Sequence, residues 1–170
     1  MTTSNNFIKA IEFTLPWETG RDRSGKVRAD GGYTNDPKDP GGETKWGISK
    51  RAHPNLDIKN LTLDSAFEIY KTDYYDSYKL LKTYPVDMDS LPIALAVAIF
   101  DTGVNCGVGK AANWYNLSHK ENDPLKALVG RRLDHYNQIA SRNTSLKGFY
   151  NGWINRLNDL RKYCEILSSQ

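Results

Sequence analysis

The sequence predicts a mostly α fold of the α+β class, with a helical body and one small Gly-rich lobe that is irregular or β-structured. Its 170 residues correspond to one domain of ordinary size. Apolar side chains recur at helical spacing in several segments. Residues 20–47 hold seven glycines and two prolines, which exclude a long helix there. We therefore expect a single domain over residues 1–170, with the lobe at about 18–50 and the helical body at about 55–170.

The first helix is expected at about residues 5–15, because the apolar side chains of this segment fall on one helical face. Pro16 follows and either kinks this helix or ends it, since proline lacks the N–H that a helix interior needs. In the Gly-rich lobe that comes next, residues 26–28 or 33–34 are the candidates for short strands. The rest of the lobe is expected to form tight turns.

Further helices follow the lobe, and their ends carry recognisable signals. Thr62 is placed to cap the second helix, which stops near Pro85. Pro92 lies at an early position of the most apolar helix, where its missing N–H is harmless. Asp123 and Pro124 supply the N-cap and the first position of a later helix. The expected bounds are about 63–81, 93–100, a short helix from the turn at 106–109 to about 117, 124–140 and 146–166.

Charge and hydropathy exclude several classes of protein. With 23 Lys and Arg against 20 Asp and Glu, the net charge of +3 is too small for a dedicated nucleic-acid binder, and no nucleic-acid partner is expected. The longest apolar run, residues 93–100, is too short to cross a bilayer, so no membrane insertion is expected. Residues 1–6 have neither the basic nor the apolar region of a secretory signal. We expect a monomer that is made in the cytoplasm without a signal peptide.

Cysteines and histidines form no metal-binding pattern in this sequence. Cys106 and Cys164 are too few for a disulfide framework and lack the spacing of metal ligands. The three histidines are scattered along the chain. We therefore expect no metal and no cofactor.

Acidic residues gather in the Gly-rich lobe, and loops on a rigid scaffold often carry functional groups. Most of these residues suit solvation or turn formation. Glu18 differs from them, because it follows Trp17 at the end of an apolar helix. Partial removal from water favours the protonated form of a carboxyl. A protonated carboxylic acid with a second acidic group across the substrate is what cleavage of a glycosidic bond requires.

Two segments carry a resemblance to a known family. They are Phe13-Thr-Leu-Pro-Trp-Glu-Thr-Gly20 and Asp30-Gly-Gly-Tyr-Thr-Asn-Asp-Pro-Lys-Asp-Pro-Gly-Gly-Glu-Thr-Lys-Trp-Gly-Ile-Ser49. They resemble glycoside hydrolase family 108, whose members are N-acetylmuramidases found as phage endolysins and in bacterial secretion-activator proteins. The similarity continues over most of the chain, through residues 50–54, 57–62, 100–109 and 152–156.

The resemblance implies a lysozyme-like fold and a peptidoglycan substrate. The bond cleaved would be the β-1,4 link between N-acetylmuramic acid and N-acetylglucosamine, and the partner would be the peptidoglycan glycan strand. A phage endolysin for host cell lysis is then expected, acting in the periplasm after holin-type or other release. Two alternatives stay open: a lytic transglycosylase of the same fold, and a non-catalytic peptidoglycan-binding or secretion-accessory protein.

The position of the catalytic Glu is where this sequence departs from the family pattern. The family has this Glu directly before Gly-Gly-Tyr, where the present sequence has Asp30. Either Asp30 replaces the acid, or Glu18 is the acid and about eleven residues are inserted before Tyr33. We favour Glu18, because it ends the first helix and because the aspartate side chain is one methylene shorter. A displacement of about 1 Å is poorly tolerated in catalysis.

The resemblance also implies residues that assist the acid. Asp39 would stabilise the opposite face of the sugar or polarise a water, and Thr44 would position that water. Tyr33 and Trp46 are candidates to line the saccharide cleft, and Asn105 is a candidate to hydrogen-bond an N-acetyl group. The structural alternatives are a turn cap for Asp39, a hydroxyl bonded to backbone for Thr44, core packing for Tyr33 and Trp46, and a helix C-cap for Asn105.

Overall fold

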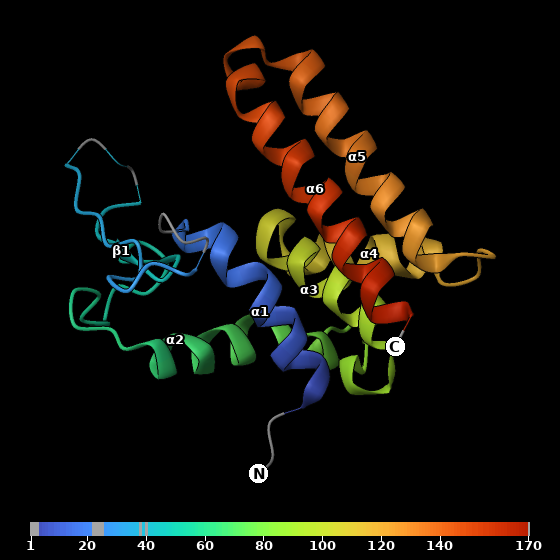
Figure 1. Ribbon diagram of the computed structural model, residues 1–170, viewed down its shortest axis with the longest axis horizontal. Coiled ribbons are helices and arrows are strands. Elements are labelled where there is room, and N and C mark those ends of the chain that lie inside the picture. Colours follow the sequence, from blue (N-terminus) through green and yellow to red (C-terminus); the bar gives the residue numbers. More distant parts are fainter. Residues whose placement is uncertain (1–3, 22–25, 38, 40, 170) are drawn as a thin grey trace.

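The computed structural model describes residues 4–21, 26–37, 39 and 41–169. It consists of a helical body and a small lobe that lies at the end of helix α1 (Figure 1). The main helices are α1 (Asn5–Thr19), α2 (Leu63–Tyr70), α3 (Ile93–Cys106), α4 (Val108–Ser118), α5 (Pro124–Arg142) and α6 (Lys147–Ser168). The shorter helical turns are η1 (Lys71–Tyr75), η2 (Asp76–Leu80), η3 (Met88–Ser90) and η4 (Thr144–Leu146). The mostly α fold class that the sequence predicts is confirmed.

Helix α1 extends past its predicted end, and Pro16 lies inside it. The prediction ended this helix near residue 15, whereas the observed helix continues to Thr19. Proline removes one backbone hydrogen bond, but the residues around it are buried against the body, so packing stabilises the last turn. Gly20 follows the helix with a φ of 75°, a left-handed conformation that favours glycine. Glu18 therefore lies in the last turn of α1.

The lobe contains a β-hairpin, in which β1 (Thr44–Lys45) pairs antiparallel with β2 (Ile48–Ser49). The two residues of its turn, Trp46 and Gly47, have φ values of 55° and 76°. Positive φ at both central positions is the requirement of a type I′ turn, whose twist matches that of the strands. The hairpin therefore points its tight turn, and not an open loop, toward the body.

The prediction of a strand at residues 26–28 or 33–34 is wrong. Val27 and Thr34 form only isolated bridges, with Arg21 and Thr44 respectively. Turns interrupt the chain between the two segments, at residues 29–32. Neither segment is long enough between turns to build a ladder of its own, because strand pairing needs a partner of matching length.

The segment after the lobe changes its helical pitch along its length. Residues 63–80, which were expected as one helix over about 63–81, form α2, then the π-helical turn η1 and then the 3-10 turn η2. Tyr70, Tyr75 and Tyr78 are all buried. The wide turn between the first two and the tight turn between the last two bring all three rings to the core side.

Helix α3 is the centre of the core. Every residue from Ala94 to Gly103 is buried, and the helix contacts α1, α4, α5 and α6. It continues beyond its expected end at residue 100 to Cys106, so the expected turn at 106–109 is reduced to a break at Gly107 before α4 begins. The apolar run thus carries the polar residues that follow it into the interior of the protein.

Helices α5 and α6 form a hairpin that rises beyond the end of α1 (Figure 1). Asp123 accepts a hydrogen bond from the N–H of Lys126, and Pro124 begins α5, as the sequence predicts. Both helices end within two residues of the predicted bounds at 124–140 and 146–166. Within the described residues, no helix has the length and apolar character needed to cross a membrane.

Candidate active site

Glu18 stands where α1, the hairpin and α6 meet. Gly47 in the hairpin turn lies against it: a Cβ on this glycine would be 2.8 Å from the Glu18 Cβ and would overlap the Tyr70 hydroxyl. Glycine is therefore the residue that allows the lobe to approach this carboxyl so closely. The Glu18 side chain keeps 23% of its surface exposed, so solvent still reaches it.

Arg156 of α6 holds the Glu18 carboxylate. Its Nη1 lies 2.7 Å from Glu18 Oε1, and only 6% of the residue is exposed. Its Nε and Nη2 donate instead to Asp101 Oδ1, over 3.1 and 2.7 Å. A guanidinium bound on both edges has one orientation. The helical body, rather than the lobe, therefore sets the direction of the Glu18 carboxylate.

Asp101 of α3 is the fully buried centre of this arrangement. It also accepts hydrogen bonds from Thr14 Oγ1, over 3.0 Å, and from Arg132 Nη1, over 2.7 Å. Burial alone would raise the pKa of Asp101, but the charges and hydrogen bonds of Arg156 and Arg132 outweigh burial and lower this pKa to about 2. Two carboxylates and two guanidiniums thus balance in charge, which is the condition under which buried charges are tolerated.

Tyr70 of α2 joins the helical body to the hairpin. Its hydroxyl donates to the Trp46 carbonyl oxygen over 3.0 Å, and the residue is buried. Burial, and to a smaller extent the charge of Glu18, raise the pKa of Tyr70, so the phenol stays a neutral donor. This hydrogen bond holds the turn that carries Gly47 against Glu18.

Asp39 and Thr44 lie in the lobe and bond to their own loop. The Asp39 carboxylate accepts a hydrogen bond from the Gly41 N–H over 2.7 Å, which is a turn cap, and the residue is exposed. The Thr44 hydroxyl donates to the Gly42 carbonyl oxygen over 3.2 Å. In the part of the chain that the structure describes, no hydrogen bond or ion pair joins either residue to Glu18. Their catalytic roles stay predictions.

Asp30 is held as an anion on the surface of the lobe. Arg28 donates to both of its oxygens, over 2.9 and 2.6 Å, and the Gly32 N–H donates to Oδ1 over 3.0 Å. The hydrogen bonds from Arg28, followed by the one from Gly32, lower the pKa of Asp30 well below its usual range. A carboxylate stabilised in this way is a poor proton donor.

The two aromatic candidates of the lobe differ in exposure. Tyr33 is partly exposed, and its hydroxyl donates to Glu43 Oε1 over 2.7 Å. Trp46 is only 7% exposed, and its Nε1 donates to the Leu61 carbonyl oxygen over 3.1 Å. An indole enclosed in this way offers no open face to a sugar. The structure therefore corrects the expected place of Trp46 in the cleft lining: this side chain packs the lobe.

Asn105 lies in the last turn of α3 and is not its C-cap, which is Gly107. Its Oδ1 accepts a hydrogen bond from the Tyr136 hydroxyl over 2.6 Å. That hydroxyl in turn accepts from Arg132 Nε over 2.6 Å. Asn105 is thereby connected, through Arg132 and Asp101, to the buried charges that orient Glu18.

Three members of this arrangement were not expected as site residues: Arg156, Arg132 and Tyr70. Of these, Arg156 alone lies in a segment that carries the family resemblance, residues 152–156. One signal for them exists in the sequence, because Arg132 lies four residues after Leu128, on the apolar face of its helix. A charged residue on a buried face needs a partner of opposite charge. Asp101, directly after an apolar run, is the complementary signal. Which charges pair is decided only when the helices pack.

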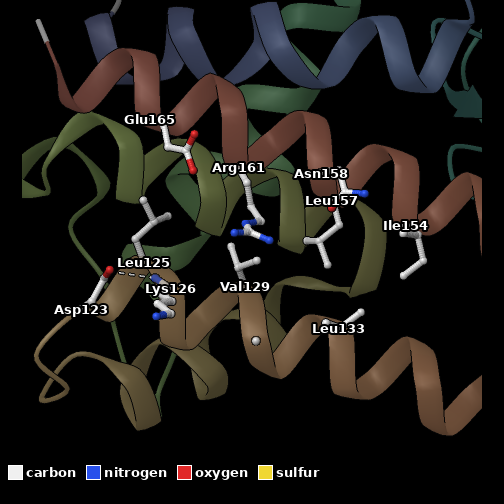
Figure 2. A pocket seen from close by; sticks show the side chains of 11 residues that line it. Asp123, Leu125, Lys126, Val129, Leu133, Ile154, Leu157, Asn158, Arg161 and Glu165 are labelled. Atoms are coloured by element: carbon white, nitrogen blue, oxygen red, sulfur yellow. Dashed lines mark hydrogen bonds between the residues drawn. The ribbon is translucent and has the colours of Figure 1, made fainter.

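Away from Glu18, the described helices form an apolar pocket but no metal site. The pocket has a volume of about 330 Å³ and lies between α5 and α6. Figure 2 shows Leu125 and Val129 of α5 facing Leu157 and Ile154 of α6 across it. Glu18 is not among its lining residues. Among the described residues, no group of three or more His, Cys, Asp or Glu side chains is arranged to hold a metal ion.

An acidic residue at the end of the first helix, between a helical body and a small Gly-rich lobe, defines a protein of the lysozyme-like fold. The family model for glycosyl hydrolase 108 matches residues 26–107, which include most of the lobe, α2 and α3. Over these residues the chain is similar to the glycosyl hydrolase 108 family. The match includes Asp30 and begins after Glu18, so it does not test Glu18 as the acid.

One solved structure agrees with this fold. The structure of Brucella abortus SagA is similar over 96% of this chain and 96% of that chain, with a TM-score of 0.65 and 19% sequence identity. At this identity the similarity shows the fold alone. No curated protein matches the sequence at a significant level.

Proposed function

We propose that this protein is an N-acetylmuramidase, which hydrolyses the β-1,4 bond between N-acetylmuramic acid and N-acetylglucosamine in peptidoglycan glycan strands. The observation that carries the proposal is the placement of Glu18. Arg156 of α6 and Gly47 of the lobe fix this carboxyl from two sides, while part of its side chain stays open to solvent. The match of residues 26–107 to a glycoside hydrolase family model supports the class of reaction.

In this reaction Glu18 donates a proton to the glycosidic oxygen as the leaving sugar departs. Asp39 stabilises the positive charge that develops on the other sugar or polarises the attacking water, and Thr44 positions that water. Both side chains must turn from their bonds with Gly41 and Gly42 toward the substrate. Short polar loops permit this change, because few packing contacts oppose it.

The ion pair with Arg156 constrains how Glu18 acts. A carboxyl donates a proton only when it is not paired with a guanidinium, so the contact between Glu18 and Arg156 is expected to open in the saccharide complex. Asp101 retains Arg156 through Nε and Nη2 when this happens. Glu18, with one ion pair and 23% exposure, is the member of the pair that is free to move.

We also propose that the protein is a phage endolysin that acts as a monomer. It would be made in the host cytoplasm and would reach the peptidoglycan through a holin-type pore or another route of release. This part of the proposal is supported by the family resemblance of the sequence. Release of soluble muropeptides from purified sacculi, without any membrane component, is the first result that it requires.

The decisive experiment compares Glu18→Gln with Asp30→Asn on purified sacculi. Loss of a general acid lowers the rate by roughly 100-fold or more, so Glu18→Gln is expected to release fragments at a small fraction of the wild-type rate. Asp30→Asn is expected to stay active, because Asp30 is an exposed partner of Arg28. Glu12→Gln on the exposed side of α1 is the matched control.

Thermal unfolding shows whether each variant is folded, so a lost activity can be assigned to chemistry. Wild-type turnover in a folded Glu18→Gln protein would show that Glu18 is not the acid. If Asp30→Asn alone abolishes activity, the acid is Asp30 and not Glu18. Sedimentation of wild-type protein with sacculi, without released fragments, would indicate the non-catalytic alternative.

A lytic transglycosylase is the second candidate, and one observation favours it. Glu18 is oriented by the body, whereas Asp39 is exposed and bonded to its own turn, so one carboxyl alone is pre-positioned. An enzyme that works with a single acid forms a 1,6-anhydro end instead of adding water. Mass spectrometry of the released muropeptides distinguishes the two reactions, because the transglycosylase product lacks one water.

A further inference from the structure

Helix α6 carries one stripe of side chains that begins beyond the end of α1. Phe149, Trp153, Arg156 and Leu160 follow one another at spacings of four, three and four residues, so they share a face of the helix. Leu160 is buried and Arg156 pairs with Glu18. The lower part of the stripe is therefore covered by the body.

Helix α1 does not cover the upper part of this stripe, which consists of Phe149 and Trp153. The ring of Phe13 lies near that of Tyr163, and Glu18 contacts Arg156, so α1 runs antiparallel to α6. Helix α1 ends at Thr19, near the level of Arg156. Figure 1 shows the α5–α6 hairpin continuing past this end. Phe149 lies seven residues before Arg156, which is about 10 Å along the helix axis.

The aromatic residues of this upper part form a ladder that leads from the core to solvent. Tyr136 of α5 is buried, and its ring stacks on Trp153 with centroids 5.3 Å apart. Trp153 is partly exposed and stacks with Phe149, with centroids 6.4 Å apart. Phe149 is 61% exposed. The ring of Phe149 is therefore open to solvent at the end of this ladder, on the face of α6 that leads to Glu18.

Asn105 adds a polar group to the same place. Tyr136 contacts both partners, since its ring stacks on Trp153 and its hydroxyl donates to Asn105 Oδ1. This hydrogen bond fixes the amide so that the oxygen is occupied and the Nδ2 group remains as donor. No hydrogen bond from Nδ2 is found among the described residues. The buried Tyr136 is thus in contact with the ring of Trp153 and with the amide of Asn105, whose Nδ2 is a free donor.

We propose that Phe149, Trp153 and the amide of Asn105 form a subsite for an N-acetylated hexosamine of the glycan strand, adjacent to Glu18. The apolar face of a pyranose ring packs on an aromatic side chain, and the acetamido carbonyl accepts a hydrogen bond from Nδ2. The distance from Phe149 to Arg156 along α6 is comparable to the length of a disaccharide. This inference rests on the proposed function, since it takes Glu18 as the site of cleavage.

Binding is measured directly, so that the subsite is tested apart from catalysis. The protein is titrated with soluble N-acetylglucosamine oligomers and with amidase-treated glycan strands that lack stem peptides, by calorimetry and tryptophan fluorescence. Phe149→Ala removes the exposed ring and is expected to weaken binding of both by roughly 3- to 10-fold, the range that single aromatic contacts supply. Asn105→Asp, which keeps the acceptor for Tyr136 and loses the donor, is expected to weaken binding similarly.

Ile166→Ala is the matched control, because Ile166 is an equally exposed apolar residue on α6 far from the stripe, at 56% exposure. Kinetics on sacculi should show a raised KM and a nearly unchanged kcat for Phe149→Ala. Unchanged affinity for the peptide-free glycans in both variants would overturn the proposal. A raised KM on sacculi, whose strands carry stem peptides, together with unchanged affinity for the peptide-free glycans would assign the ladder to the peptide instead. Normal binding with no cleavage by wild type would retain the subsite and reject the proposed function.

Discussion

Arg156, Asp101 and Arg132 carry charge into the interior, and this decides what single substitutions do. Asp101 and Arg132 are fully buried, and Arg156 is nearly so. Among the described residues, each charge is compensated by the other members of the group and by Glu18 alone. Removal of one partner leaves a buried charge without compensation, which is far more costly than loss of an exposed ion pair.

We predict that Arg156→Gln lowers the free energy of unfolding by about 3–5 kcal/mol, because it leaves Asp101 short of a counter-charge. The same substitution removes the group that orients Glu18 before the saccharide binds, so release of fragments from sacculi should be slower. Urea denaturation measures the first effect. Arg28→Gln, in the exposed pair with Asp30, is the matched control and should change stability little. Equal losses in both variants would contradict the structural role of Arg156.

At the scale of elements, the hairpin is positioned by its turn and not by its strands. The strands β1 and β2 have two residues each and supply little stability by themselves. The hydrogen bond from Tyr70 to the Trp46 carbonyl oxygen and the close approach of Gly47 to Glu18 hold the hairpin against the body. The contact between the lobe and Glu18 therefore depends on Gly47, which has no side chain.

We predict that Gly47→Ala destabilises the protein by about 1–3 kcal/mol, the range for a strained backbone or displaced neighbour, and reduces activity. The new Cβ would overlap the Tyr70 hydroxyl and approach Glu18 Cβ to 2.8 Å, at a φ of 76°. Thermal unfolding and sacculus release measure the two effects. Gly130→Ala in the middle of α5, where a Cβ would meet nothing within 4 Å, should instead stabilise by about 0.5–1 kcal/mol. Normal activity in Gly47→Ala would show that the lobe does not need this approach.

The helices could be predicted from the sequence because their signals are local. Residues 124–142 illustrate this: Asp123 caps the helix, Pro124 begins it and apolar residues recur at helical spacing. The strand candidates failed because pairing depends on residues far along the chain, such as Thr34 with Thr44. The expected end of the first helix near residue 15 was too early for a similar reason, since tertiary burial of the last turn outweighs the hydrogen bond that Pro16 lacks.

At the scale of the whole molecule, the buried charge group links stability to pH. The pKa of Asp101 is lowered to about 2 in the folded protein, whereas an unfolded aspartate has a pKa near 3.9. Its charge interactions stabilise the fold fully above the unfolded value, and this contribution is lost as the pH falls through the folded value. The window is therefore about pH 4 down to about pH 2.

We predict that the free energy of unfolding decreases between pH 4 and pH 2, as urea titrations at a series of pH values would show. Asp101→Asn, if it folds, should be less stable at pH 6 and should lose less between pH 4 and pH 2. Because Asp30 also has a lowered pKa, Asp30→Asn serves as the comparison. A pH slope in Asp101→Asn as steep as that of wild type would assign the acid sensitivity to other carboxyls.

The sequence by itself determined the helical order, the Gly-rich lobe and the candidate acid at the end of the first helix, because these depend on neighbouring residues. Only the tertiary structure decided which side chains meet. It joined Glu18 to Arg156 across 138 positions of sequence, buried Trp46 in the lobe and tied Asp30 to Arg28. The physical reason is that charge pairing and burial depend on distances in space, which helix packing sets and local periodicity does not.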